Sequence, residues 1–281
     1  MSGEQTDQTL ETSGAGASRL FAPDALRGLI IVFMALDHAS YFIAQKHPSS
    51  EIWDGVFPVY YDVLTFLTRF VTHFAAPGFF LLMGVGMFLF TRSRLQRGWS
   101  RWAVMRHFLI RGALLMLLQV LVVNRAWELS LQGWGVTIYT GVLFALGAAM
   151  VIASLFVWLK PPYLLALALV LFVGTELLHP GLGEWNSVSH SPVSVIHLYA
   201  GGDTTLWSFY PIWPWMELVV FGLLFGNWLA RDPRQAFSRA WKLGLGFLVA
   251  FAVIRYFDGF GNIRPRMGNS WIDLLNTVKY P

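Results

Sequence analysis

Several long apolar stretches constrain the fold of this chain more than any other feature of its sequence. A helix of about 20 apolar residues spans the roughly 30 Å hydrocarbon core of a bilayer, so stretches of that length indicate membrane-spanning helices. We therefore predict an all-α fold, a polytopic membrane helix bundle with about seven transmembrane helices. The predicted spans lie near residues 25–44, 62–90, 104–123, 136–158, 162–178, 210–229 and 243–257.

The composition supports this assignment and removes several kinds of chemistry. Of the 281 residues, 56% are hydrophobic and 13% are charged, whereas soluble proteins have roughly a quarter charged residues. The chain has no cysteine, which excludes disulfides, thiol nucleophiles and cysteine-ligated metals. His190 and His197, in the long connection before residue 210, lack a metal-ligand spacing, and we predict no metal site.

The positive charges are clustered between the apolar stretches. A net charge of +4 could indicate a nucleic-acid partner, but such clustering is a topology signal, and we exclude nucleic acid. The basic connections and the N-terminus are then cytoplasmic, and the neutral connection from His179 to Tyr210 lies outside as the expected lid of an external site. We expect a multi-pass protein of the cell (inner) membrane, embedded in the lipid bilayer. The basic connections carry Arg92, Arg94, Arg97 and Arg101, then Lys160, then Arg231, Arg234, Arg239 and Lys242.

The chain divides into a short tail and one membrane domain. Residues 1–18 are rich in Gly, Ser, Thr, Glu and Gln, so they cannot bury enough apolar surface to fold, and we predict a disordered cytoplasmic tail. Residues 19–281 form the transmembrane domain. Within it, Gly222 with Gly226, and Gly84 with Gly86, are expected to let helix backbones approach closely. The oligomeric state stays open.

A few ionisable residues lie within the predicted spans. Each costs roughly 2.5–3.5 kcal/mol on insertion scales, so each must face a partner, water or a ligand. Counted inward at about 1.5 Å per residue, Asp37, His38 and Arg69 have similar depths. One interpretation is an Asp37–Arg69 pair that fixes helix packing; the other is a general base, His38, oriented by Asp37. The set comprises Asp37 and His38 in the first span, Arg69 and His73 in the second, Arg111 in the third and Glu217 in the sixth.

Arginines nearer the basic connections are a second group of candidates. Arg27 and His38 are eleven residues apart, which places them on one helix face, about 16 Å apart along the axis. Arg27 is equally suited to a local ion pair with an N-capping Asp24. Arg106 and Arg111 rise from the basic connection toward the core, where they either anchor the helix or bind an anionic ligand.

Five segments carry a resemblance to a known family. Together they resemble the bacterial heparan-alpha-glucosaminide N-acetyltransferase-like family, which is related to the wider transmembrane acyltransferases. The match covers roughly residues 19 to 281. The segments are DALRGLIIVFMALDH at 24–38, LTRFVTHFAAPGFFLLMG at 67–84, RGALLMLLQVLVVN at 111–124, YPIWPW at 210–215 and LNTVKYP at 275–281.

The resemblance implies acyl transfer across a membrane. Acetyl-CoA, or another acyl-CoA, would be offered from the cytoplasmic side, and a sugar hydroxyl or amine of an envelope or exported glycan would accept the acyl group outside. His38 is then the expected base with Asp37 beside it, and His73 is the alternative base. The expected donor-binding residues are Arg27, Arg69, Arg106 and Arg111.

Two further expectations accompany this interpretation. Members of the family usually continue past the Lys-Tyr-Pro segment with further spans, so the acyltransferase domain at 19–281 is expected to be truncated at its C-terminus. A competing hypothesis is a transporter, in which the same buried Asp, His and Arg side chains form a proton or substrate relay. A scaffold without chemistry is the third interpretation.

Overall fold

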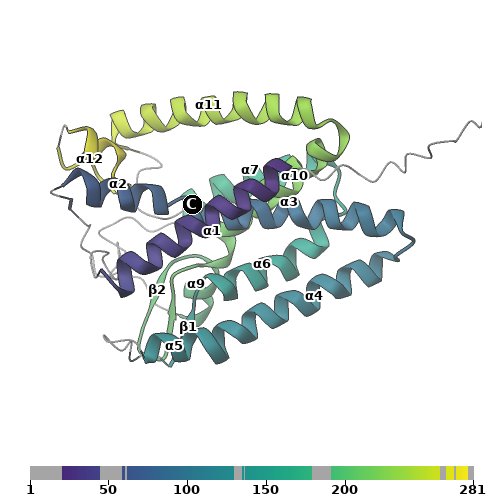
Figure 1. The fold of residues 1–281 in the computed structure, drawn as a ribbon, viewed down its shortest axis with the longest axis horizontal. Helices are drawn as coiled ribbons and strands as arrows, with labels where there is room; N and C mark the ends of the chain where they lie inside the picture. The colour runs from purple at the N-terminus through teal and green to yellow at the C-terminus, as the bar shows by residue number, and fades with distance from the viewer. Residues whose placement is uncertain are drawn as a thin grey trace, which may run out of the picture.

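The chain forms a bundle of long helices with a small sheet at one end (Figure 1). The computed structural model describes residues 21–44, 59–60, 62–129, 135, 137–178, 191–259, 264–268 and 270–277. The predicted tail at 1–18 and residues 179–190 of the predicted outer lid lie outside these residues. The helices are α1 (Phe21–Phe42), α2 (Val63–Thr72), α3 (Ala75–Gln96), α4 (Arg101–Leu118), a π-helix η1 (Gln119–Val123), α5 (Asn124–Glu128), α6 (Val142–Phe156), α7 (Pro161–Leu178), α9 (Pro192–His197), α10 (Ile212–Arg231), α11 (Pro233–Phe257) and α12 (Trp271–Leu275); the strands are β1 (Ile138–Thr140), β2 (Gly201–Gly202) and β3 (Leu206–Ser208).

The prediction of a polytopic helical membrane protein is confirmed, although the number of full-length spans differs. Within the described part of the chain, 6 helices are long and apolar enough to cross a bilayer. The fourth predicted span, 136–158, contains only the 15-residue helix α6. Its first residues instead form β1, which pairs in parallel with β3, while β2 pairs antiparallel with β3.

The second predicted span, 62–90, consists of two helices rather than one. α2 ends at Thr72 and α3 begins at Ala75. Pro77 explains the break, because its ring clashes with the carbonyl four residues earlier, that of His73, and it has no amide hydrogen to donate. α2 packs against α1.

The three basic connections meet at one end of the bundle. Arg101 lies over the ring of Trp158 at 5.3 Å, and Arg239 lies over Trp228 at 5.4 Å. Arg92 donates to the carbonyl of Ala230, joining the ends of α3 and α10. We call this end the basic end; α2, α12 and the sheet lie at the opposite end (Figure 1). Which end faces the cytoplasm stays a prediction.

The core lies where α10 packs against α3, α6 and α7. Gly84 of α3 and Gly222 of α10 face each other so closely that a Cβ on either would lie 2.9 Å from the other's Cα. Gly226 similarly lies against Phe88, where an added Cβ would be 2.9 Å from the Phe88 Cβ. The expectation that Gly84, Gly222 and Gly226 allow close packing is therefore confirmed. Gly112 and Gly147 form a similar contact between α4 and α6 that the sequence did not reveal.

Buried amides fix the sheet to the end of α4. Gln119 is fully buried at the start of the π-helix, and its Nε2 donates to the carbonyl of Tyr139 at 3.4 Å. The amide of Asn124, in the orientation that satisfies its neighbours, donates to the same carbonyl at 2.8 Å and accepts from the Tyr139 amide at 2.9 Å. These bonds pair the backbone of an edge strand that would otherwise be unsatisfied.

We predict that Gly222→Ala destabilises the bundle while Gly244→Ala does not. The added methyl at 222 would run into the backbone of α3, whereas nothing lies within 4 Å of a Cβ at Gly244. Overpacking typically costs roughly 1–3 kcal/mol. Thermal unfolding in detergent measures the difference, and equal melting temperatures for the two variants would contradict this account of the α3–α10 contact.

Candidate active site

An ion pair between the first two helices is the centre of the candidate site. Nη1 of Arg69 on α2 lies 2.7 Å from Oδ1 of Asp37 on α1, and the two side chains are only 7% and 14% exposed. The similar depth predicted for these residues is thus consistent with a direct contact. Since two helices share one buried pair, it fixes their register.

His38 lies next to this pair with one ring nitrogen already engaged. Its Nδ1 is 2.8 Å from the carbonyl oxygen of Met34, one turn earlier on α1. A carbonyl only accepts hydrogen bonds, so Nδ1 must carry the hydrogen, and in the neutral ring Nε2 is the acceptor. The ring stacks on Phe42 at 6.2 Å and is otherwise exposed. A neutral imidazole in this tautomer has the form of a general base.

The contact that orients His38 therefore differs from the one expected. The sequence indicated Asp37 or another nearby carboxylate, but the partner of Nδ1 is a backbone carbonyl. Adjacent helical residues project about 100° apart, so the Asp37 side chain can face Arg69 while His38 turns away from it. In this arrangement the Asp37 carboxylate contacts Arg69.

Tyr60 is a neighbour of the pair that sequence analysis missed. Burial raises the pKa of Tyr60 to about 12, while the charge of Arg264 lowers it and that of Asp37 raises it. The phenol therefore stays protonated at neutral pH and can donate a hydrogen bond. Its ring packs edge-on against Phe66 of α2 at 5.6 Å. A tyrosine in a connection has no periodic pattern that would reveal this position.

His73, the alternative base, lies at the break between α2 and α3. It is the C-capping residue of α2, and its backbone amide donates to the carbonyl of Arg69 at 3.1 Å. The side chain is half-buried. The break thus places His73 one turn beyond Arg69, on the core side of the candidate site.

The predicted donor-binding arginines are divided between the two ends of the bundle. Arg69 belongs to the ion pair. Arg27 makes the local pair with Asp24, at 3.0 Å, and its guanidinium extends over Gly86 of α3. Arg106 and Arg111 are exposed on α4. The structure therefore brings Asp37 and Arg69 together, with His38 the next residue on α1, and leaves the other arginines nearer the basic end.

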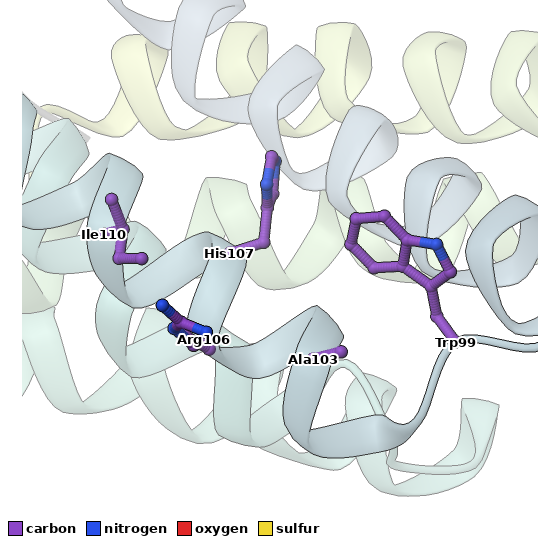
Figure 2. Close-up of a pocket in the computed structure, with 5 residues that line it drawn as sticks. All are labelled: Trp99, Ala103, Arg106, His107 and Ile110. Carbon is purple, nitrogen blue, oxygen red and sulfur yellow. The ribbon is translucent and has the colours of Figure 1, made fainter.

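Arg106 lines an open groove of about 390 Å³ near the basic end. Figure 2 shows Arg106 and His107 projecting from one turn of α4 and Ile110 from the next, with Trp99 in the connection before the helix. The ring of His107 stacks on Phe90 of α3 at 4.4 Å. A guanidinium beside flat aromatic surfaces suits a ligand with phosphates and a planar base, so the residues fit the nucleotide end of an acyl-CoA.

The predicted spans also contain a buried carboxylate, and we searched the described residues for a metal site. Glu217 is buried in α10 at 5% exposure, and its Oε2 has no hydrogen-bond partner within the described ranges. No group of three or more His, Asp or Glu residues that could hold a metal ion occurs in the same part of the chain.

Comparison with known proteins identifies the family. The family model described as heparan-alpha-glucosaminide N-acetyltransferase, catalytic, matches residues 19–254. The chain belongs to this family. The resemblance seen in the sequence is thereby confirmed, and the ion pair, His38, His73 and the Arg106 groove all lie within the matched region.

A curated relative in the same family is the mouse heparan-alpha-glucosaminide N-acetyltransferase. It is 30% identical to this chain over 164 residues, which are 56% of this chain and 22% of the mouse protein. The chain therefore matches less than a quarter of that relative's length. No solved structure matches the chain. For the family member described here, the substrates have to be argued from its own residues.

We predict that the Asp37–Arg69 pair contributes both to the stability of the protein and to acetyl transfer, and that double substitution separates the two contributions. Arg69→Met alone leaves a buried carboxylate unpaired and should cost roughly 3–5 kcal/mol. The double variant Asp37→Leu/Arg69→Met removes both charges and should recover most of that loss. Thermal unfolding of the three proteins measures the stability term. Recovery of native acetyl transfer by the double variant would show that the pair serves packing alone.

Proposed function

We propose that this protein is a membrane-embedded acetyltransferase that moves the acetyl group of acetyl-CoA to an amine or hydroxyl of a sugar. The observation that carries the proposal is His38, with Nδ1 committed to a carbonyl and Nε2 left as the acceptor, next to a buried ion pair. Membership of a family described as N-acetyltransferase supplies the reaction class and the donor.

In the proposed reaction His38 acts as the base on the acceptor. The amine or hydroxyl attacks the thioester carbonyl carbon, its proton passes to Nε2, and the carbon–sulfur bond breaks. The imidazolium then returns the proton to the CoA thiolate. The Met34 carbonyl accepts from Nδ1 throughout, so it stabilises the imidazolium that forms. No acyl-enzyme on cysteine is possible because the chain has none.

Arg69 and His73 are proposed to act on the thioester oxygen and on the position of the base. Arg69 is held by Asp37 at 2.7 Å, so its guanidinium keeps a fixed direction, and its positive charge would stabilise the negative charge that develops on the thioester oxygen. His73, one turn further, is the alternative base or a donor to the same oxygen. These roles rest on the arrangement of α1 and α2 and on the family.

The acyl donor is proposed to approach from the basic end. CoA carries several phosphate charges, and Arg27, Arg106 and Arg111 are cations between that end and the site. The groove beside Arg106 would hold the phosphate-bearing part of the donor, and the acceptor would approach from the opposite end. An envelope or exported glycan is the proposed acceptor class, with the basic end cytoplasmic and the chain in the cell membrane.

We predict that His38→Ala abolishes most acetyl transfer without loss of folding. Removing a general base typically costs on the order of 10²- to 10⁴-fold in rate. The purified full chain would be incubated with radiolabelled acetyl-CoA and a chromogenic glucosaminide as amine acceptor, and release of free CoA would be followed. His38→Ala should retain its melting temperature and acetyl-CoA binding.

His73→Ala provides the matched comparison for that experiment. If His73→Ala loses transfer and His38→Ala keeps the native rate, the roles of the two histidines must be exchanged. If the native protein releases no CoA with any sugar acceptor, the acetyltransferase proposal fails and the transporter hypothesis gains.

We predict that the basic end is cytoplasmic and binds the donor. Single cysteines are clean probes because the chain has none. In intact cells an impermeant maleimide should label Ser189→Cys, which lies outside the described residues, and not Ser93→Cys near the end of α3. In inverted vesicles Ser93→Cys should react, and acetyl-CoA should slow the reaction. Labelling of Ser93→Cys in intact cells would reverse the orientation, and a lack of protection would contradict donor binding there.

A further inference from the structure

One buried arginine fastens the C-terminal part of the chain to the end of α11. Arg255 is 2% exposed. Its Nε donates to the carbonyl of Leu274 at 3.0 Å, Nη1 to that of Arg264 at 2.7 Å and Nη2 to that of Asp273 at 2.8 Å. A guanidinium presents its donors in a rigid planar fork, so three bonds to one segment fix the position of that segment.

A second set of bonds closes the same segment on itself. Arg264 donates to Oδ1 of Asp273 at 3.3 Å and to the carbonyl of Asn276 at 3.2 Å. Asp273 also accepts from the amides of Met267 at 2.9 Å and Gly268 at 3.0 Å. Burial raises the pKa of Asp273, but the hydrogen bonds from these amides and the contact with Arg264 lower it by more. The pKa is therefore below its ordinary value, and the carboxylate is ionised at neutral pH.

This segment packs on α2, the helix that carries Arg69. The ring of Trp271 on α12 meets that of Phe66 edge-on at 5.6 Å, and Phe66 is 2% exposed. Phe66 precedes Arg69 by three residues, so the two share one face of α2. Figure 1 shows α12 beside α2, at the end away from the α3–α4 connection.

The same segment also reaches the neighbourhood of Asp37. Tyr60 packs on Phe66 at 5.6 Å, and its phenol is close enough to both Arg264 and Asp37 for their charges to act on it. One tyrosine therefore lies between the C-terminal segment and the ion pair. The C-terminal segment is thus linked to the Asp37–Arg69 pair in two ways, through Phe66 on α2 and through Tyr60.

α2 is a short helix, and its position depends on the elements that pack against it. It has 10 residues, and helices this short are marginal without packing partners. A short break at His73 and Phe74 separates it from α3. Among the described elements, both α1 and α12 pack against it.

We propose that residues 264–268 and 270–277, which we call the C-terminal clamp, hold α2 where Arg69 meets Asp37. Arg255, Arg264 and Trp271 are then positioning residues for the transfer reaction, which rests on the proposed function. They touch neither substrate, and they act through Phe66 and Tyr60 on the ion pair. The clamp also gives a role to Asn276, within the C-terminal LNTVKYP segment.

A nitroxide on α2 tests the clamp without any substrate. Leu67→Cys is a suitable site because Leu67 is 42% exposed and the chain has no other cysteine. In the full chain in lipid nanodiscs, Trp271→Ala and Arg255→Gln should increase the mobility of this label. Trp271→Phe, which keeps an aromatic ring against Phe66, should leave it close to native.

Two controls separate the clamp from general loss of structure. Arg266→Gln removes one positive charge from the clamp, but the side chain of Arg266 lies over the ring of Tyr256 on α11 and not against α2, so the label on α2 should not respond. A label at Leu114→Cys on α4, where Leu114 is 53% exposed, reports on the rest of the bundle. Equal mobility of the α2 label in native and Trp271→Ala protein, or an equal change at Leu114→Cys, would overturn the proposal.

The kinetic consequence distinguishes positioning from mere stability. Trp271→Ala should lower kcat for acetyl transfer to the glucosaminide by about tenfold or more, because misplacing a catalytic group by about 1 Å can cost 10²-fold. The KM for acetyl-CoA should stay native, since the donor groove lies at the other end. A rise in that KM with native kcat would overturn the positioning role. If the native chain transfers nothing, the proposed function fails while the label result still decides whether the clamp holds α2.

Discussion

The rest of the structure depends on the cost of placing charges in a membrane. Asp37 and Arg69 lie on helices that cross or enter the apolar layer, and neither could remain charged there alone. Their 2.7 Å contact satisfies both and obliges α1 and α2 to meet at that depth. The position of His38 follows, because it is the next residue on α1 and its ring is held by its own helix through Met34.

The sequence was most informative wherever a property depends on neighbouring residues in the chain. Hydropathy over about 20 residues located the membrane helices, and the alternation of charge marked the connections that meet at the basic end. It misplaced the start of α6 because residues 138–140 pair with residues 206–208, far along the chain. Apolar residues near a span look the same whether they continue a helix or form a buried strand.

The candidate site was predictable in part for the same reason. Asp37, His38 and Arg69 were visible as costly side chains at similar depth, and the structure brings Asp37 and Arg69 together. The partner of His38 was not visible, since a backbone carbonyl such as that of Met34 is present at every residue and has no sequence signature. The contacts of Arg255 were hidden likewise, because all three of its acceptors are carbonyls.

The molecule places part of its candidate chemistry on α1, a helix with little buried surface. α10 is mostly buried in a core that glycine contacts hold tightly, whereas α1 contributes few buried residues. A helix without a large apolar interface takes its position from a few directional contacts, and these can be broken one at a time. The Asp37–Arg69 pair and the bonds of Arg255 are contacts of that kind, at the same end of the bundle. The positions of α1 and α2 therefore depend on a few polar contacts. These contacts come from residues that are far apart in the sequence.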